Sequence, residues 1–171
     1  TSPVAFLNVV VNNATGNTLT AARGTTFSTT VNGTSYNYIV KDATTITPVD
    51  GVYTFSSLPV YEGTLVTNKF TVDTTNADQR FLIENINADT TTLKVTVQNS
   101  SSDTTTETYA LSTDLADVSG TSTVYYLEGA EDGKYEVIFG DGILGKAVST
   151  GNIVTLSYIV TSGDDLSLIH I

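Results

Sequence analysis

The sequence predicts a mainly β protein with antiparallel sheets in a sandwich-like arrangement, two small β-rich subdomains and at most one short helix. Three observations support this fold class. Thr, Ser, Asn and Gly accompany a hydrophobic share of 40%, a mixture that suits strands joined by polar turns. Short runs of β-forming residues recur at near-regular spacing. Between several of them lie dipeptides that favour tight hairpin turns.

The first strand is expected at Val4–Val11, where the sequence VAFLNVVV is almost continuously apolar. Such a run predicts burial on both faces or an interface. Further along, Asn32 and Gly33 separate two β-rich runs. Asn-Gly is the preferred dipeptide of a two-residue type I′ turn, because both positions need a positive φ. We therefore expect a hairpin here.

Asp50 and Gly51 repeat this arrangement between the next two runs. Pro48 and Pro59 lie close to this turn, and proline has no amide to donate to a neighbouring strand. The strands that contain them are therefore expected at a sheet edge, or to end nearby.

The second half of the chain contains more strand candidates, with one stretch at 114–118 that has room for a helical turn. We expect an N-terminal β subdomain at 1–66 and a β-rich subdomain at 67–163. Residues 164–171 are expected to form an unstructured or artefactual tail. The expected strands lie at 69–73, 80–86, 92–99, 106–112 and 122–128, with two more within 135–160.

Composition excludes several classes of function. The net charge is −11, and the seven basic residues are scattered, so no cationic patch is available to neutralise phosphates. We expect no nucleic-acid partner and no membrane partner. Cysteine is absent, which excludes disulfides and cysteine metal sites.

One loop matches a phosphate-binding pattern, since the residues from Gly140 to Lys146 read GDGILGK. Dinucleotide and P-loop sites need a helix to begin at the loop, because its N-terminus supplies the amide donors. Here a strand-like run, IVTLSYIV, follows, and the motifs that accompany a kinase glycine loop are missing. The loop is therefore interpreted as a structural turn. The predicted structural turn residues are Asn32, Gly33, Asp50, Gly51, Gly140, Asp141, Gly142 and Gly145.

Catalytic and metal-binding groups are also lacking. His170 is the only histidine, and the paired carboxylates of the chain fall in no motif that would raise a pKa. The spacing Asn85-x-Asn87-x-Asp89 resembles the start of a calcium loop, but the later glycine and glutamate positions of an EF-hand are absent. A polar turn is expected there, with a non-helical calcium site as the alternative. We predict no catalytic residue, metal ligand, cofactor or small-molecule substrate, and hence no enzyme.

Four residues are candidates for an interface: Tyr125, Tyr126, Ile143 and Leu144. Glycine-bounded apolar residues at a loop tip suit contact with another subunit, and tyrosines at strand positions suit a core edge or an interface. The alternative is a carbohydrate-stacking surface that also uses the tyrosines at 36, 38, 53, 61 and 158.

The run from Val124 to Asp164 resembles the signature region of baseplate wedge subunits of contractile-tailed bacteriophages, of the gene-product-six type and related to the baseplate J-like proteins. The residues that carry the resemblance are an aromatic-Gly-Asp-Gly at 139–142, a Gly-Asn turn at 151–152 and a V-x-L-x-Y strand at 154–158. Segments 21–40 and 60–64 also resemble the family in the expected order.

This resemblance implies a structural component of a phage tail baseplate wedge that mediates subunit–subunit assembly. The implied partners are other wedge proteins and copies of itself. The implied location is the virion, after assembly in the bacterial host cytoplasm. The family continues beyond the last strand, whereas this chain ends in DDLSLIHI, so an excised segment is expected. A cell-surface adhesin or carbohydrate-binding β module is the alternative.

Overall fold

The computed structural model describes residues 1–162, and the predicted tail at 164–171 lies outside the described residues. Strands make up 53% of the structure, and the described part contains a single helical element, the 3-10 turn η1 (Glu131–Gly133). The prediction of a mainly β fold with antiparallel sheets is confirmed. The chain forms two compact units. Within the described residues, unit 1 comprises 1–65, 89–92 and 159–162, and unit 2 comprises 66–88 and 93–158.

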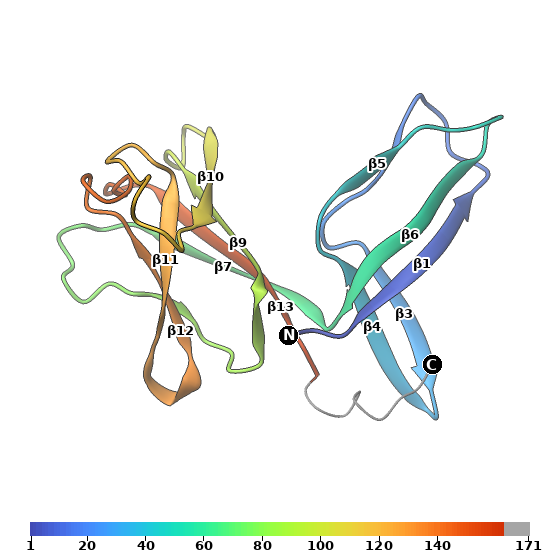
Figure 1. The fold of residues 1–171 in the computed structure, drawn as a ribbon, viewed down its shortest axis with the longest axis horizontal. Coiled ribbons are helices and arrows are strands. Elements are labelled where there is room, and N and C mark those ends of the chain that lie inside the picture. Colours follow the sequence, from blue (N-terminus) through green and yellow to red (C-terminus); the bar gives the residue numbers. More distant parts are fainter. Residues whose placement is uncertain (163–171) are drawn as a thin grey trace. The chain divides into compact units, whose positions relative to one another are not determined.

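Unit 1 is built on a four-stranded antiparallel sheet in the order β1-β6-β4-β3, and a second sheet pairs β2 with β5 (Figure 1). Its core consists of alternate residues from these strands, among them Val40, Leu58 and Val60. The strands are β1 (Val4–Val11), β2 (Leu19–Ala21), β3 (Thr26–Val31), β4 (Thr34–Val40), β5 (Thr44–Ile46) and β6 (Tyr53–Glu62).

Two tight turns of unit 1 have type I′ geometry. Asn32 and Gly33 join β3 to β4 with φ values of 49° and 84°. Asp50 and Gly51 have φ values of 50° and 77°. They lie between Val49 and Val52, whose amides and carbonyls exchange two hydrogen bonds of 2.9 Å. Positive φ at both central positions is the property for which Asn-Gly and Asp-Gly are preferred.

Pro59 does not mark an edge strand, since β6 lies between β1 and β4, and the alternative of a nearby strand end agrees with the end of β6 at Glu62. The amide of Glu62 donates to Pro3 on the β1 side. Because amides alternate in direction along a strand, position 59 faces the β4 side. The pairing of β4 with β6 ends at Val40 opposite Val60, so the missing amide of Pro59 faces a position that β4 no longer occupies.

The outer edge strand β1 alternates between half-buried and exposed residues, so burial on both faces is wrong for this apolar run. Phe6 is 68% exposed. It borders an apolar groove of about 400 Å³ that is also lined by Leu7 from β1, Phe27 from β3 and Tyr38 from β4. The alternative prediction for this strand, an interface, stays a prediction.

Unit 2 is dominated by a seven-stranded sheet in the order β7-β13-β9-β10-β11-β12-β8. Strands β10 and β11 are parallel, which the sequence did not indicate. The first and last strands of this order meet through the rings of Phe70 and Phe81, 5.6 Å apart, so the sheet nearly closes into a barrel. The strands are β7 (Thr64–Thr71), β8 (Phe81–Ile83), β9 (Ala88–Gln98), β10 (Thr106–Leu111), β11 (Val124–Gly129), β12 (Tyr135–Phe139) and β13 (Ile153–Val160).

A row of aromatic rings continues from this closure. Phe139 packs edge-to-face against Phe81 and against Tyr109, with ring centroids 5.3 Å apart in both pairs. Edge-to-face contacts place the positive rim of one ring on the negative face of the next. The row thereby joins strands β7, β8, β12 and β10, which are not all neighbours in the sheet.

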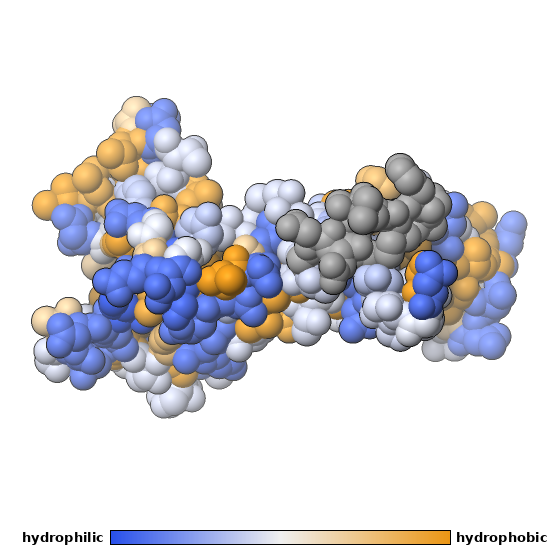
Figure 2. Space-filling view, turned by 90° about the horizontal axis from the view of Figure 1, so that it is seen from below, coloured by the Kyte–Doolittle hydropathy of each residue, from blue (hydrophilic) through white to orange (hydrophobic). Residues whose placement is uncertain are grey.

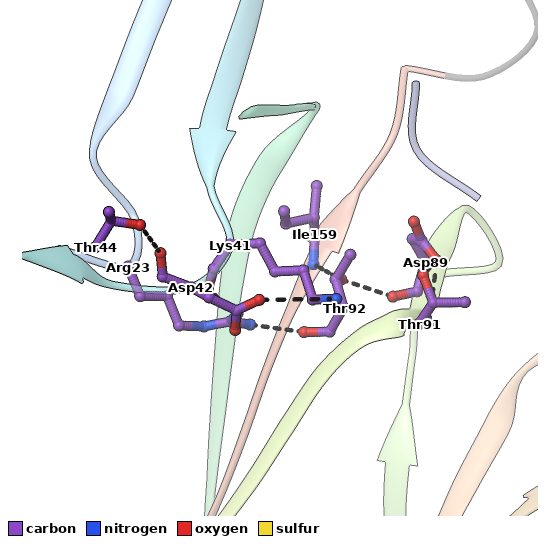
Figure 3. A network of polar contacts seen from close by, with 8 residues as sticks. All are labelled: Arg23, Lys41, Asp42, Thr44, Asp89, Thr91, Thr92 and Ile159. Carbon is purple, nitrogen blue, oxygen red and sulfur yellow. Dashed lines mark hydrogen bonds and ion pairs between the residues drawn. The ribbon is translucent and has the colours of Figure 1, made fainter. Parts of the chain in front are cut away.

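A network of hydrogen bonds holds the segment Asp89–Thr92 within unit 1 (Figure 3). The guanidinium of Arg23 donates to the carbonyl of Lys41 at 2.6 Å and to the carbonyl of Thr92 at 2.7 Å. The Thr92 hydroxyl donates to the Asp89 carbonyl at 2.7 Å and accepts the amide of Ile159 at 2.8 Å. Burial lowers the pKa of Arg23, and Asp42 opposes that shift.

The Asp89 carboxylate completes this network. It accepts the amide of Ser2, and it also accepts the amide and hydroxyl of Thr91 at 3.1 Å and 2.7 Å. Burial by itself raises the pKa of Asp89, but these hydrogen bonds to the charged form outweigh it, so the pKa lies below its ordinary value.

Candidate functional site

The loop that begins at Gly140 connects β12 to β13 and turns through hydrogen bonds of its own. The Asp141 carboxylate accepts the amides of Ile143 and Leu144 at 2.9 Å and 3.0 Å. These amides hold the pKa of Asp141 below its ordinary value, that of Leu144 contributing most. The amide of Gly142 also donates to the carbonyl of Gly145 at 2.9 Å. The aspartate thus shapes the turn in the way that Asx residues do.

The glycines of the loop serve two different purposes. Gly142 and Gly145 have φ values of 90° and 98°. The backbone of Gly140 lies outside that region. Its requirement is space, because a Cβ at Gly140 would lie 2.3 Å from the Gly145 backbone and 2.4 Å from the Leu144 carbonyl oxygen.

A second segment, Ser119–Ser122, braces the loop from the connection between β10 and β11. The carbonyl of Ser119 accepts the Gly145 amide at 3.1 Å, and the carbonyl of Ser122 accepts the Lys146 amide at 2.8 Å. Gly120 packs so closely that a Cβ there would lie 2.0 Å from the Gly142 carbonyl oxygen. The Gly-x-Gly spacing predicted the turn, but no local signal indicated this contact across more than 20 residues.

The interface candidates differ in exposure. Ile143 is 73% exposed and Leu144 is 43% exposed, at the tip of the loop. Tyr126 is half-buried, and its hydroxyl donates to the Leu144 carbonyl at 3.2 Å. Tyr125 is 4% exposed, so its ring belongs to the core of unit 2 and is not presented to a partner. Figure 2 shows that hydrophobic residues reach the surface of the chain among hydrophilic ones.

The lysine that completed the phosphate-like pattern is engaged in an ion pair. The Lys146 ammonium donates to the Glu107 carboxylate, and this hydrogen bond raises the pKa of Lys146. The loop leads into strand β13 and not into a helix. No helix N-terminus is therefore available at this loop to bind a phosphate.

The calcium-like spacing at 85–89 also forms turns. The Asn85 side chain accepts the Asn87 amide at 2.8 Å, and the Asp89 carboxylate is engaged with Ser2 and Thr91. Within residues 1–162, no group of three or more acidic or histidine side chains is placed to hold a metal ion. Nor does that part of the chain contain a helix long and apolar enough to cross a membrane.

A carbohydrate-stacking surface would need exposed tyrosine rings. The tyrosines proposed for that alternative do not provide them. Tyr38, Tyr53 and Tyr158 are buried, at 9%, 2% and 1% exposure, and Tyr36 and Tyr61 are half-buried. These rings contribute to the cores and sheet surfaces of their own units.

A family model described as bacteriophage baseplate wedge protein gp6, third domain, matches residues 65–161. The matched region is more than half of the chain and contains all the strands of unit 2, the loop at Gly140 and its brace. The chain belongs to this family. No curated protein matches the chain.

Membership of the gp6 family confirms the resemblance found in the sequence. The chain is a structural protein of the phage tail baseplate, a component of the virion tail that assembles with other baseplate proteins. The match begins at residue 65, so the strands of unit 1 from β1 to β6 lie outside it.

Proposed function

We propose that this gp6-family chain mediates subunit–subunit assembly of the baseplate wedge through the tip formed by Ile143 and Leu144. The partners are other wedge proteins and copies of the chain, assembled in the cytoplasm of the infected bacterium. The observation that supports this role is a pair of large apolar side chains, 73% and 43% exposed, on a loop with a braced backbone.

The tip has the energetic properties of an interface anchor. Fully burying a Leu or Ile side chain contributes about 1.5–3 kcal/mol. Hydrogen bonds from the loop amides to the Asp141 carboxylate and the Ser119 carbonyl already order the loop backbone. Little conformational entropy is therefore lost when a partner binds, and less of the burial energy is offset.

The test is the double substitution Ile143→Ala/Leu144→Ala. Assembly is measured by native mass spectrometry and sedimentation with the other wedge proteins of the same phage. Truncating two central anchors should weaken the complex roughly tenfold or more. Unchanged affinity would overturn the proposal.

The matched control is Ile86→Ala. Ile86 is 63% exposed in the turn between β8 and β9 of the same unit, so this substitution removes a comparable side chain away from the tip. It should leave assembly unchanged. Hydrogen exchange of β12 and β13 should be the same in all three proteins, because neither tip side chain belongs to the core.

A further inference from the structure

A second exposed hydrophobic residue, Leu115, lies on the connection that braces the apolar tip. The brace Ser119–Ser122 follows directly on a turn in which the Val118 amide donates to the Leu115 carbonyl at 3.3 Å. Leu115 is 54% exposed. The hydrogen bond from Gly145 to Ser119 ties this connection to the loop. The β10–β11 connection, which carries Leu115, and the β12–β13 loop, which carries Ile143 and Leu144, are therefore joined by a hydrogen bond, and each has exposed apolar side chains.

The charges on these two segments are all negative. Asp114 and Asp117 flank Leu115, and Asp141 lies two residues before Ile143. Segments 112–122 and 140–145 contain no lysine or arginine. The next basic residue, Lys146, is already paired with Glu107. Backbone amides lower the pKa of Asp141, so its carboxylate is ionised at neutral pH.

The charge of Asp117 lies close to the loop. Asp117 is two residues from Ser119, whose carbonyl accepts an amide of the loop. Each residue spans at most about 3.6 Å, so the Cα of Asp117 lies within roughly 7 Å of the Cα of Ser119. This is shorter than the screening length of about 8 Å at physiological ionic strength.

We propose that this acid-rimmed tip docks into an apolar pocket whose rim carries lysine or arginine side chains, on another baseplate protein. The inference rests on the proposed function and adds the chemistry of the partner. Charge complementarity identifies it, because an acidic or neutral rim would repel these carboxylates or gain nothing from them. The acid-rimmed tip comprises Leu115, Ile143, Leu144, Asp114, Asp117 and Asp141.

The test is Asp114→Asn/Asp117→Asn, which removes two charges but keeps side-chain size, including the Asp114 oxygen that accepts the Ala116 amide. Association and dissociation rates with the other wedge proteins of the same phage are measured by surface plasmon resonance from about 50 to about 500 mM NaCl. At low salt the association rate should fall roughly three- to tenfold, with a shallower salt dependence. Dissociation should change little.

The control Glu131→Gln/Asp132→Asn removes the same charge from the η1 turn of the same unit. Asp132 has a φ of 58°, which asparagine tolerates. The control should keep the wild-type association rate within about twofold, because its charges lie outside the tip. Equal rates and salt slopes for the two variants, or faster association without Asp114 and Asp117, would overturn the basic rim.

The two proposals fail in different ways. If Ile143→Ala/Leu144→Ala leaves assembly intact, the proposed function itself fails. If that variant weakens assembly while Asp114→Asn/Asp117→Asn keeps the wild-type salt dependence, only the basic rim fails. A complex of the chain with itself that the double alanine abolishes would make a second copy the occupant, and would also overturn the basic rim.

Discussion

The hairpin turn at Asn32-Gly33 in unit 1 and the loop at Gly140 in unit 2 both depend on glycine, for different physical reasons. A Cβ added at Gly33 would meet no atom within 4 Å, and the glycine is needed only for its φ of 84°. A Cβ added at Gly140 would meet backbone atoms at 2.3–2.4 Å. The turn at Asn32-Gly33 depends on the backbone conformation of its own residues, whereas the loop at Gly140 depends on close packing against its surroundings.

This difference separates a simple connection from the loop that we propose to dock. The turn at Asn32-Gly33 needs only to reverse the chain between β3 and β4. The loop at Gly140 is braced by Ser119 and Ser122 and presents Ile143 in a fixed backbone. A tip that docks benefits from such bracing, because preorganisation reduces the entropy lost on binding.

Gly140→Ala is expected to destabilise the chain more than any other single substitution considered for these two turns. The added methyl group has no space, so the Leu144–Gly145 backbone must move, at a cost of about 3 kcal/mol in unfolding free energy. Chemical denaturation measures the loss. Hydrogen exchange should increase in β12 and in the Ser119–Ser122 brace while β3 and β4 stay protected.

The matched variant is Gly129→Ala. Gly129 ends β11, and a Cβ there would meet nothing within 4 Å. Its φ is not positive. This substitution should be neutral or stabilise the chain by roughly 0.5 kcal/mol. Equal destabilisation by both alanines would show that the loop is not closely packed.

The two units are expected to differ in their sensitivity to acid. Unit 1 holds the segment Asp89–Thr92 through a carboxylate that is 4% exposed, whereas the core of unit 2 contains the aromatic row at Phe139. The pKa of Asp89 is below its ordinary value of 3.8. A depressed folded-state pKa contributes stability that is present above the unfolded-state pKa and is lost as pH falls through the folded-state pKa.

Asp89→Asn should therefore cost about 1.5 kcal/mol near neutral pH, through weaker hydrogen bonds from Ser2 and Thr91. The difference between this variant and the wild type should shrink as pH falls below about 4. Urea denaturation at a series of pH values measures it, with hydrogen exchange at Thr92 as the local readout. A difference that stays constant down to about pH 2 would contradict this role of the carboxylate.

The sequence predicted those features that depend on neighbouring residues, such as tight turns. Asn-Gly and Asp-Gly indicated the turns of unit 1, and the strand after Lys146 excluded a phosphate loop. The pairing of strands that lie far apart in the sequence could not be predicted from such local features. The position of Pro59 became acceptable only because β4 ends at Val40, and no pattern near Pro59 contains that information.

The same limit applies to the candidate site. Ile143 and Leu144 were identifiable because glycines bound an apolar pair. Tyr125 was not distinguishable from Tyr126 in the same strand, since which face is buried depends on the sheet around β11. Gly120 carried no signal for its contact with Gly142. The residues that form the tip, Ile143 and Leu144, can therefore be identified from the sequence. Gly120, which packs against the loop, cannot.

Gly33→Ala, in the turn of unit 1, is expected to cost less stability than Gly140→Ala. Gly33→Ala places a Cβ in free space but retains a φ of 84°, so the cost is only the left-handed backbone, about 1 kcal/mol. Gly33→Asn should recover most of it, because asparagine tolerates this region. Chemical denaturation measures both variants. A loss for Gly33→Ala as large as that for Gly140→Ala would mean that the two turns do not differ in packing.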